Sequence, residues 1–223
     1  NNSVLESNVN GDRSSGIISL VQNGGLSYFN SIFDDMFLAY RTNNYDQVIY
    51  GTPGNNILHP PSGQDDGVTD SSLESFKQYL IAGGNGNDEI FGGRSIDLLL
   101  GGNGDDTLNG NAGDDKLFGG DGNDILNGGF GNNEFEGGKG DDIINGGAIV
   151  EGIYLGRDTA FYNGSLEEHR IEFLSDGRVK IIDNIANRNG TDTLSAVRYA
   201  LFNNKQIDLS AGQDISFVVD TTG

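Results

Sequence analysis

One large apolar residue recurs every nine positions through the middle of this chain. The recurring positions are Ile90, Leu99, Leu108, Leu117, Leu126, Phe135 and Ile144. A stretch rich in Gly, Asn and Asp separates each of them from the next. Because side chains alternate along a strand, a three-residue strand centred on each position points only that apolar residue inward. The pattern therefore predicts a stack of short strands around a thin apolar column.

From Gly83 to Asn145 the sequence is a nonapeptide that occurs seven times without a gap. The units are GGNGNDEIF, GGRSIDLLL, GGNGDDTLN, GNAGDDKLF, GGDGNDILN, GGFGNNEFE and GGKGDDIIN. Each fits G-G-x-G-x-D-x-U-x with some substitutions, where U is the apolar residue. A flexible Gly/Asp linker has no reason to keep U apolar in every unit, so the repeat indicates a folded structure.

The turns of this repeat carry the candidate chemistry. Glycine enters positive φ without steric cost, so a Gly-rich turn can bend sharply and leave its carbonyl groups free. An aspartate occupies position 6 in six of the units: Asp88, Asp97, Asp106, Asp115, Asp124 and Asp142. Carbonyl and carboxylate oxygens in a flexible cage suit Ca²⁺ better than Mg²⁺, which prefers octahedral sites and keeps its waters. The turns are therefore candidate calcium sites.

The repeat resembles the calcium-binding nonapeptide of the RTX (repeats-in-toxin) family. The resemblance implies an all-β chain built as a right-handed parallel β-roll, in which two successive units make one turn. It also implies that calcium lies between unit n and unit n+2. Unit n supplies the carbonyls of positions 2 and 4 and its Asp, and unit n+2 supplies the carbonyls of positions 1 and 3 and its own Asp.

We call the units from Gly83, Gly101, Gly119 and Gly137 the first row, and this row is intact. The ligands that the resemblance implies are Gly84, Gly86 and Asp88 with Gly101, Asn103 and Asp106; Gly102, Gly104 and Asp106 with Gly119, Asp121 and Asp124; and Gly120, Gly122 and Asp124 with Gly137, Lys139 and Asp142.

The units from Gly92, Gly110 and Gly128 form the second row, which departs from the pattern at Ser95, Asn111 and Asn133. Here the resemblance implies ligation by Gly93, Ser95 and Asp97 with Gly110, Ala112 and Asp115, because position 4 contributes only a carbonyl. A site that needs Asn133 is expected to be weaker or empty, since an amide replaces one of two carboxylates. A final half-unit around Asp158 is expected to close the last site. In all, about 4–6 calcium ions are expected.

Composition narrows the possible partners. The net charge is −20, with 36 Gly and no Cys. This acidity speaks against nucleic acid and anionic membranes, which require basic surfaces. Without metal, the crowded carboxylates and scarce apolar surface predict an unfolded repeat region. The lack of Cys fits an extracellular protein stabilised by metal. The sequence shows no signal peptide or membrane span, and its start at Asn1 suggests a fragment of a longer chain.

Three domains are predicted: an N-terminal segment (1–50), the β-roll (51–162) and a C-terminal cap (163–223). The N-terminal stripe Phe29, Ile32, Phe33, Met36, Phe37 and Tyr40 is expected to cap the open end of the roll, with a ligand groove as the alternative. The roll is expected to begin with a degenerate unit from Gly51, with Asn56 at the Asp position and Leu58 inward. A helical insertion is expected near 69–79, where Ser71 and Glu74 form a capping box.

The C-terminal residues alternate as antiparallel strands do, in HRIEFL, RVKIID, TDTL, VRYALF and QIDL. They resemble the cap that follows β-rolls in many type I-secreted bacterial proteins. The matching residues are Asp158-Thr159-Ala160, then Gly190-Thr191-Asp192-Thr193-Leu194 with Val197, and Phe202 with Asp208-Leu209.

Three functions follow from the sequence. The leading one is a non-catalytic, calcium-triggered folding and export module of a secreted RTX protein, with the type I secretion machinery and the rest of the parent protein as partners. The second is an adhesin-type module that binds carbohydrate, ice or a surface through Asn109, Asn127 and Asn145. The third is part of an enzyme whose active site lies partly in residues 1–50 or outside this chain. Only His59 and His169 are histidines, and neither H-E-x-x-H nor G-x-S-x-G occurs.

Overall fold

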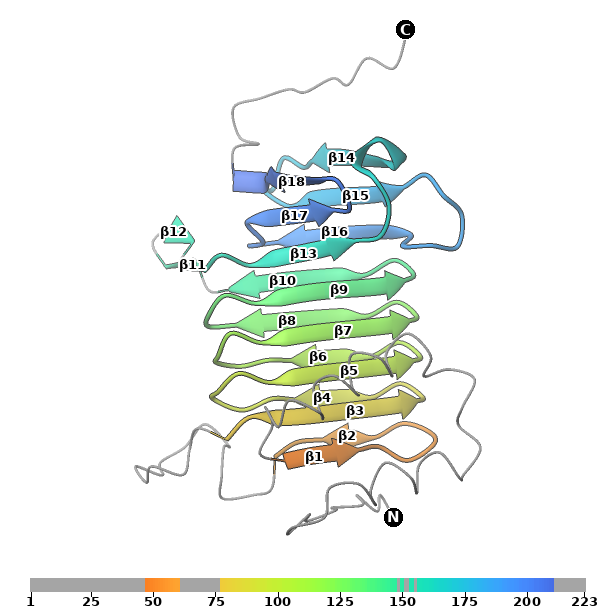
Figure 1. The fold of residues 1–223 in the computed structure, drawn as a ribbon, viewed down its shortest axis with the longest axis vertical. Coiled ribbons are helices and arrows are strands. Elements are labelled where there is room, and N and C mark those ends of the chain that lie inside the picture. The colour runs from red at the N-terminus through yellow and green to blue at the C-terminus, as the bar shows by residue number, and fades with distance from the viewer. Residues whose placement is uncertain (1–46, 61–76, 148, 151–152, 155, 211–223) are drawn as a thin grey trace, which may run out of the picture.

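The chain is a two-sheet parallel β-roll with a strand-rich cap at its C-terminal end (Figure 1). The computed structural model describes residues 47–60, 77–147, 149–150, 153–154 and 156–210. Within these ranges the helical elements are the short 3-10 helix η1 (Leu166–Glu168) and a 3-10 turn at Leu209 and Ser210. The predicted all-β roll is therefore confirmed. The N-terminal apolar stripe and residues 69–76 of the expected helix lie outside the described residues, and Tyr79 begins a strand.

Most odd-numbered strands make one face of the roll and most even-numbered strands make the other. The first sheet runs in the order β1 (Gln47–Tyr50), β3 (Tyr79–Asn85), β5 (Leu98–Asn103), β7 (Lys116–Asp121), β9 (Glu134–Lys139), β13 (Thr159–Tyr162), β17 (Tyr199–Phe202) and β18 (Lys205–Asp208). The second runs in the order β14 (His169–Phe173), β15 (Val179–Asp183), β16 (Thr191–Ser195), β10 (Ile143–Gly147), β8 (Ile125–Gly129), β6 (Thr107–Asn109), β4 (Glu89–Phe91) and β2 (Ile57–Leu58). A separate hairpin joins β11 (Ile149–Val150) and β12 (Ile153–Tyr154).

Neighbouring strands of the repeat pair in parallel between residues 18 positions apart. In the first sheet, Leu99 pairs with Leu117, and Leu117 with Phe135. In the second sheet, Leu108 pairs with Leu126. Two nonapeptides thus complete one turn, and successive units alternate between the two sheets.

Several strands are longer than the three residues predicted for each unit. In the first sheet β5, β7 and β9 have six residues each, because the ladder continues into the glycines of the following unit. Gly102 pairs with Gly120 in this extension, although its φ of 125° is outside the usual range for a strand. The turn is correspondingly shorter than the pattern predicted.

The apolar column lies inside the roll, as predicted. All seven U residues are exposed by at most 1%, and Leu58 of the degenerate first unit is equally buried. They form one continuous core with apolar residues of the cap, among them Val179, Ile181 and Leu194. Since each turn adds only two large apolar side chains to this core, hydrophobic burial per turn is small.

A second apolar cluster lies outside this core, and the alternation rule did not predict it. Leu80, Ala82, Leu98 and Leu100 neighbour the inward-facing Ile81 and Leu99 along their strands, so they lie on the opposite face of the first sheet. They are nevertheless only 2–5% exposed. The sequence signal is that Leu98, Leu99 and Leu100 are all apolar, whereas every other unit has a polar residue on at least one side of U.

The cap joins the roll through strands that continue both parallel sheets. Strand β16 pairs in parallel with β10, and β17 pairs in parallel with β13. The predicted antiparallel strands attach to these two: β14, β15 and β16 form an antiparallel run, and β18 is antiparallel to β17. The proposed domain limits stay predictions, but these pairings place the cap in the same two sheets as the roll.

We expect Leu108→Ala to destabilise the calcium-loaded protein by about 2–5 kcal/mol, because it opens a cavity in a column with few neighbouring apolar side chains. The free energy of unfolding should be measured by denaturant titration at a fixed calcium concentration, since a bound ligand adds to stability. Thr107→Ala, on the neighbouring outward position, is the matched control. A loss below about 1 kcal/mol at Leu108 would contradict a rigid apolar column.

Candidate metal centre

The position-6 aspartates of the first row stack above one another along the roll. The backbone N–H of each donates to Oδ1 of the aspartate one turn later: Asp88 to Asp106 at 2.7 Å, Asp106 to Asp124 at 2.8 Å, and Asp124 to Asp142 at 2.8 Å. Each side chain is thereby held at the edge of the core, where the turn passes into the strand. The sequence places these residues 18 apart, and the roll converts that spacing into direct contact.

The second row forms an equivalent ladder. Asp97 donates from its backbone to Oδ1 of Asp115 at 2.8 Å, Asp115 to Oδ1 of Asn133 at 3.0 Å, and Asn133 to Oδ1 of Asp158 at 2.8 Å. Asp158 thus takes the place of a repeat aspartate, although residues 148–155 interrupt its unit. The structure brings together the carboxylates that the sequence assigned to this row.

The second carboxylate oxygens are the unusual feature of the rows. Oδ2 of Asp88, Asp106, Asp115, Asp124 and Asp142 is buried and has no hydrogen-bond partner. These five side chains belong to residues that are only 1–2% exposed. An unpaired charge in such a place is strongly unfavourable, and buried charges are normally paired or coordinate metals. These Oδ2 atoms therefore mark places where a bound cation would neutralise the carboxylates.

A carbonyl oxygen converges with Oδ2 beside the first glycine of the unit. A Cβ added to Gly101 would lie 2.5 Å from Oδ2 of Asp106 and 2.6 Å from the carbonyl oxygen of Gly119, and at Gly110 the distances to Asp115 and Gly128 are both 2.6 Å. We call each such place a cradle. The same convergence occurs at Gly83, Gly119 and Gly92. Glycine is required because a side chain would fill a space bordered by two oxygens, which are the type of ligand that Ca²⁺ takes at 2.3–2.6 Å.

Other expected ligands also face the gap between turns. The carbonyl oxygens of Gly84 and Gly86 point at Gly102 and Gly104 of the next turn, where any Cβ would overlap them. The position-3 carbonyls of Asn103, Asp121 and Lys139 each accept a backbone N–H from the preceding turn at 2.8 Å. A carbonyl oxygen has two lone pairs, so this bond still leaves one for a metal.

Within the described part of the chain, no three His, Cys, Asp or Glu side chains converge on one point. Each gap offers two carboxylates, and the remaining oxygens come from the backbone. This donor set is made of oxygen alone, which favours Ca²⁺ over Zn²⁺, whose sites use Cys and His. The residues present therefore fit the calcium ion that the repeat implies.

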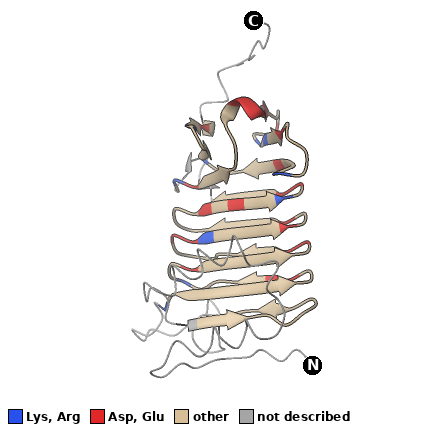
Figure 2. Cartoon of the chain, turned by 45° about the vertical axis from the view of Figure 1, so that its right-hand side comes forward, with Lys and Arg blue, Asp and Glu red and all other residues tan. Residues whose placement is uncertain are grey.

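Acidic residues collect where the strands meet the turns, along both edges of the roll (Figure 2). Some of these lie outside the rows and have other partners. The Lys139 ammonium contacts Asp121 at 2.8 Å, and Lys116 pairs with Glu134 at 2.6 Å. Both ion pairs are exposed, so each adds little to stability. Because their side chains pair with each other, Lys139 and Asp121 would coordinate a metal only through their backbone carbonyls.

The second row is weaker where its sequence departs from the repeat. Oδ1 of Asn133 accepts the Asp115 N–H, so its Nδ2 points toward Gly128, where it has no partner. An amide N–H cannot bind a cation, which supports the expectation of a weak or empty site. Asp97 also differs, because its Oδ2 accepts a hydrogen bond from Gly93 N–H at 2.5 Å. The carbonyl of Ser95 still points at Gly113, as its place in the row requires.

Burial raises the pKa of the row aspartates in the metal-free fold. The pKa rises to about 7 for Asp106, about 8 for Asp115 and Asp124, and about 6 for Asp142, mainly through desolvation. Neighbouring carboxylates raise it further, whereas the backbone hydrogen bonds of the ladder lower it. Near neutral pH, the metal-free roll must therefore keep these groups protonated or bear their buried charge.

The first row extends beyond the predicted residues at both ends. Asn56 donates from its backbone to Oδ1 of Asp88 at 2.7 Å, as its place in the degenerate first unit suggested. Asp192 accepts the backbone N–H of Asp142 at 3.1 Å and was not predicted as a site residue. The signal for Asp192 was present, since Gly190-Thr191-Asp192-Thr193-Leu194 matches positions 4 to 8 of the repeat.

The three asparagines of the alternative binding hypothesis do form a ladder on the second sheet. Nδ2 of Asn127 donates to Oδ1 of Asn109 at 2.9 Å, and Nδ2 of Asn145 donates to Oδ1 of Asn127 at 2.8 Å. These bonds give the asparagines a structural role. The two histidines are separate from the rows: His59 bonds the Pro60 carbonyl, and His169 is buried against Tyr162 and Phe202.

Comparison with known families agrees with this geometry. The model of the RTX calcium-binding nonapeptide repeat (4 copies) matches residues 82–117, 100–134 and 118–148. A search of curated proteins found no match. Among the described residues, no helix has the length and apolar character needed to cross a bilayer.

We expect Asp106→Ala to remove two bound calcium ions and Asp97→Ala to remove one, because Asp106 faces gaps on both sides while Asp97 begins its row. Calcium bound per chain should be counted by equilibrium dialysis, and stability measured at a fixed calcium concentration. Asp124→Ala should behave like Asp106→Ala, and Asp176→Ala, in an exposed turn of the cap, is the control. Equal losses for Asp106 and Asp97 would contradict sharing along the row.

We expect the metal-free chain to gain β structure as the pH falls from about 8 to about 5. The folded pKa values lie above the ordinary value of 3.8, so the fold binds protons more tightly than the unfolded chain and loses stability as pH rises through the range of about 6–8. With calcium the dependence should reverse, since protons compete for the carboxylates. Far-UV circular dichroism in both conditions tests this, and a metal-free spectrum independent of pH would contradict it.

Proposed function

Because residues 82–148 belong to the RTX calcium-binding nonapeptide repeat family, we propose that this chain is a calcium-triggered folding and export module of a secreted bacterial protein. RTX repeats bind calcium and are typical of secreted proteins, which establishes the coarser part of this function. The trigger, the export role and the ion count of about five are the proposed part.

The observation that carries the proposal is the set of five cradles, in each of which a buried Oδ2 faces a backbone carbonyl oxygen. Asp88, Asp106 and Asp124 would hold three ions in the first row, with Asp142 completing the last. Asp97 and Asp115 would hold one in the second row, and the cradle at Gly110 would hold a weaker one beside Asn133. When bound, calcium would neutralise carboxylates that nothing else in the described fold compensates.

A calcium-dependent fold follows from the balance of forces in the roll. Each turn contributes two large apolar side chains to the core and also buries two position-6 side chains, most of them acidic. The chain as a whole carries a net charge of −20. Ligand binding stabilises a fold in proportion to the logarithm of ligand concentration, summed over its sites. Several sites acting together therefore favour unfolding at low calcium and folding at high calcium.

Export would use both states. A chain that stays unfolded in a low-calcium cytosol can pass through the type I secretion machinery as an extended polypeptide. Outside the cell, calcium would fold it and give the rest of the parent protein a stable end. The module itself is non-catalytic in this proposal, because the repeat is a structural calcium-binding element, and an enzymatic activity would belong to the parent protein.

An adhesin-type function is the second candidate, and it rests on the outer face of the second sheet. The ladder of Asn109, Asn127 and Asn145 runs beside Ile125 and Ile143, which are 37% and 46% exposed. Such a regular surface could bind a glycan or another repeating ligand. A glycan array in the presence of calcium, repeated after replacing the three asparagines by Ser, tests this candidate.

We expect a cooperative coil-to-β transition when the metal-free chain is titrated with calcium up to about 10 mM, the range of weak extracellular sites. Far-UV circular dichroism measures the transition, and magnesium at the same concentration is the control because it suits these flexible oxygen cages poorly. A chain that is already folded in chelator at pH 7.5, with no change on adding calcium, would contradict the proposed trigger.

A further inference from the structure

A segment of the cap lies on the last turn of the roll as though it were another repeat unit. The backbone N–H of Thr193 donates to the carbonyl of Asp142 at 2.8 Å, just as Ile143 donates to Asp124 at 2.8 Å one turn earlier. Leu194 pairs with Ile144 and joins the apolar core. Residues 190–194 therefore continue the second sheet in the register of the repeat, although residues 146–189 separate them from the last regular unit.

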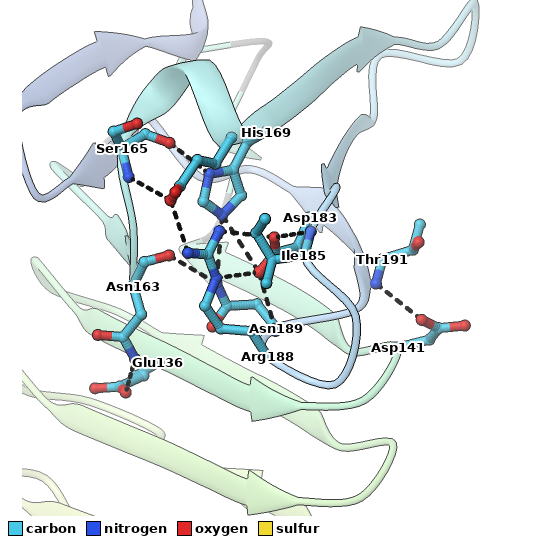
Figure 3. Close-up of polar contacts among 11 residues, drawn as sticks. Glu136, Asp141, Asn163, Ser165, His169, Asp183, Ile185, Arg188, Asn189 and Thr191 are labelled. Carbon is cyan, nitrogen blue, oxygen red and sulfur yellow. Dashed lines mark hydrogen bonds and ion pairs between the residues drawn. The ribbon is translucent and has the colours of Figure 1, made fainter.

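The turn before β16 also copies the repeat. Thr191 N–H donates to Oδ1 of Asp141 at 2.8 Å (Figure 3), as Asp141 N–H donates to Oδ1 of Asn123 at 2.9 Å. Gly190 has a φ of 75°, and a Cβ there would overlap the carbonyl oxygen of Gly140. Gly140 is at position 4 of its unit. Its carbonyl thus faces the cap in the same way as the position-4 carbonyls of earlier units face the next turn.

Two buried oxygen atoms at this junction have no hydrogen-bond partner. One is Oδ2 of Asp142, and the other is the hydroxyl of Tyr162, a residue that is 5% exposed. The Tyr162 ring stacks on Phe202, with centroids 5.4 Å apart, which fixes its direction. Burial raises the pKa of this hydroxyl, and the carboxylates of Asp192 and Asp142 raise it further.

We propose that Asp142 and Asp192 bind a further calcium ion at the junction of roll and cap, with the hydroxyl of Tyr162 facing the same two carboxylates. Asp192 is only 1% exposed and accepts the Asp142 N–H as every later aspartate of a row does. A neutral hydroxyl cannot balance two buried carboxylates, whereas a divalent cation can. This inference rests on the proposed function, because it assumes that calcium binds the regular turns.

The cap holds Asp192 in place through a polar network in the loop that precedes it (Figure 3). The Arg188 guanidinium donates to both oxygens of Asp183 at 2.6 and 2.7 Å and to Glu168 at 2.7 Å. Nδ2 of Asn189 donates to the carbonyl of Asn163 at 3.0 Å. This network links the loop to β14, β15 and η1, so the cap must be folded before Asp192 reaches Asp142. Calcium at the junction would therefore couple folding of the cap to folding of the roll.

The test is Asp192→Asn, a change of nearly equal shape that this chain already contains at Asn133, where the ladder is maintained. The variant should bind one calcium ion fewer than the wild type in equilibrium dialysis. Amide hydrogen exchange in residues 179–195 should also lose much of its protection by calcium. Asp176→Asn is the matched control in the cap. An unchanged ion count with unchanged protection would overturn the junction site.

A second variant decides the matter if Asp192→Asn fails to fold. Tyr162→Phe keeps the stacking on Phe202, and terbium, which replaces calcium, emits when a nearby tyrosine absorbs light. Tyrosine-sensitised terbium emission should fall in Tyr162→Phe, and emission equal to the wild type would overturn the site. If the wild-type chain itself shows no calcium-dependent folding, the proposed function fails. If it folds with calcium but these variants match it, only the junction site fails.

Discussion

The roll depends on how carboxylates buried in line with one another are neutralised. Each turn places an aspartate directly above another, and the ladder hydrogen bonds satisfy only Oδ1. The remaining oxygens face carbonyl groups, which are also electron-rich. The glycines at position 1 leave that space open. The geometry that makes the stack compact thus also leaves buried oxygen atoms that a bound cation would neutralise.

This constraint explains why the roll needs so little core. A conventional domain gains stability from a wide apolar interior, whereas this one has a column two side chains wide and a chain of backbone hydrogen bonds between turns. In the proposed function, calcium binding would supply the missing free energy and would also set the condition for folding. A larger core would fold the chain regardless of calcium, so the proposed calcium-triggered folding would require a thin column.

Much of the regular region could be predicted from the nonapeptide itself. The inward column and the position-6 aspartates follow from a period of nine and the alternation of side chains. The pairing of units 18 residues apart did not follow from the pattern, because nine residues per strand-and-turn fits either a one-unit or a two-unit turn. That step came from the resemblance to the RTX family.

Features that depend on pairing between strands far apart in the sequence were not predicted. Asp192 lies in a partial repeat motif, but the residues between Asn145 and Gly190 do not keep the nine-residue period. Only the parallel pairing of β10 with β16 shows that this motif continues the repeat. Leu98 and Leu100 were expected to face away from the core, and their burial was missed because alternation gives the face of a side chain and not what covers it. The weaker site expected at Asn133 stays a prediction, and it rests on a local change of chemistry, one amide in place of a carboxylate.

The hairpin of β11 and β12 shows that the roll can be interrupted without losing its row. The chain leaves the turn after Gly147 and returns at Gly156, and Asp158 still accepts the Asn133 N–H at 2.8 Å. Gly147 N–H closes the gap by donating to Oδ2 of Asp158 at 2.8 Å. The third position of a unit is thus a point where foreign sequence can be spliced into the scaffold. A binding loop grafted there would be displayed only after calcium assembles the turns that support it.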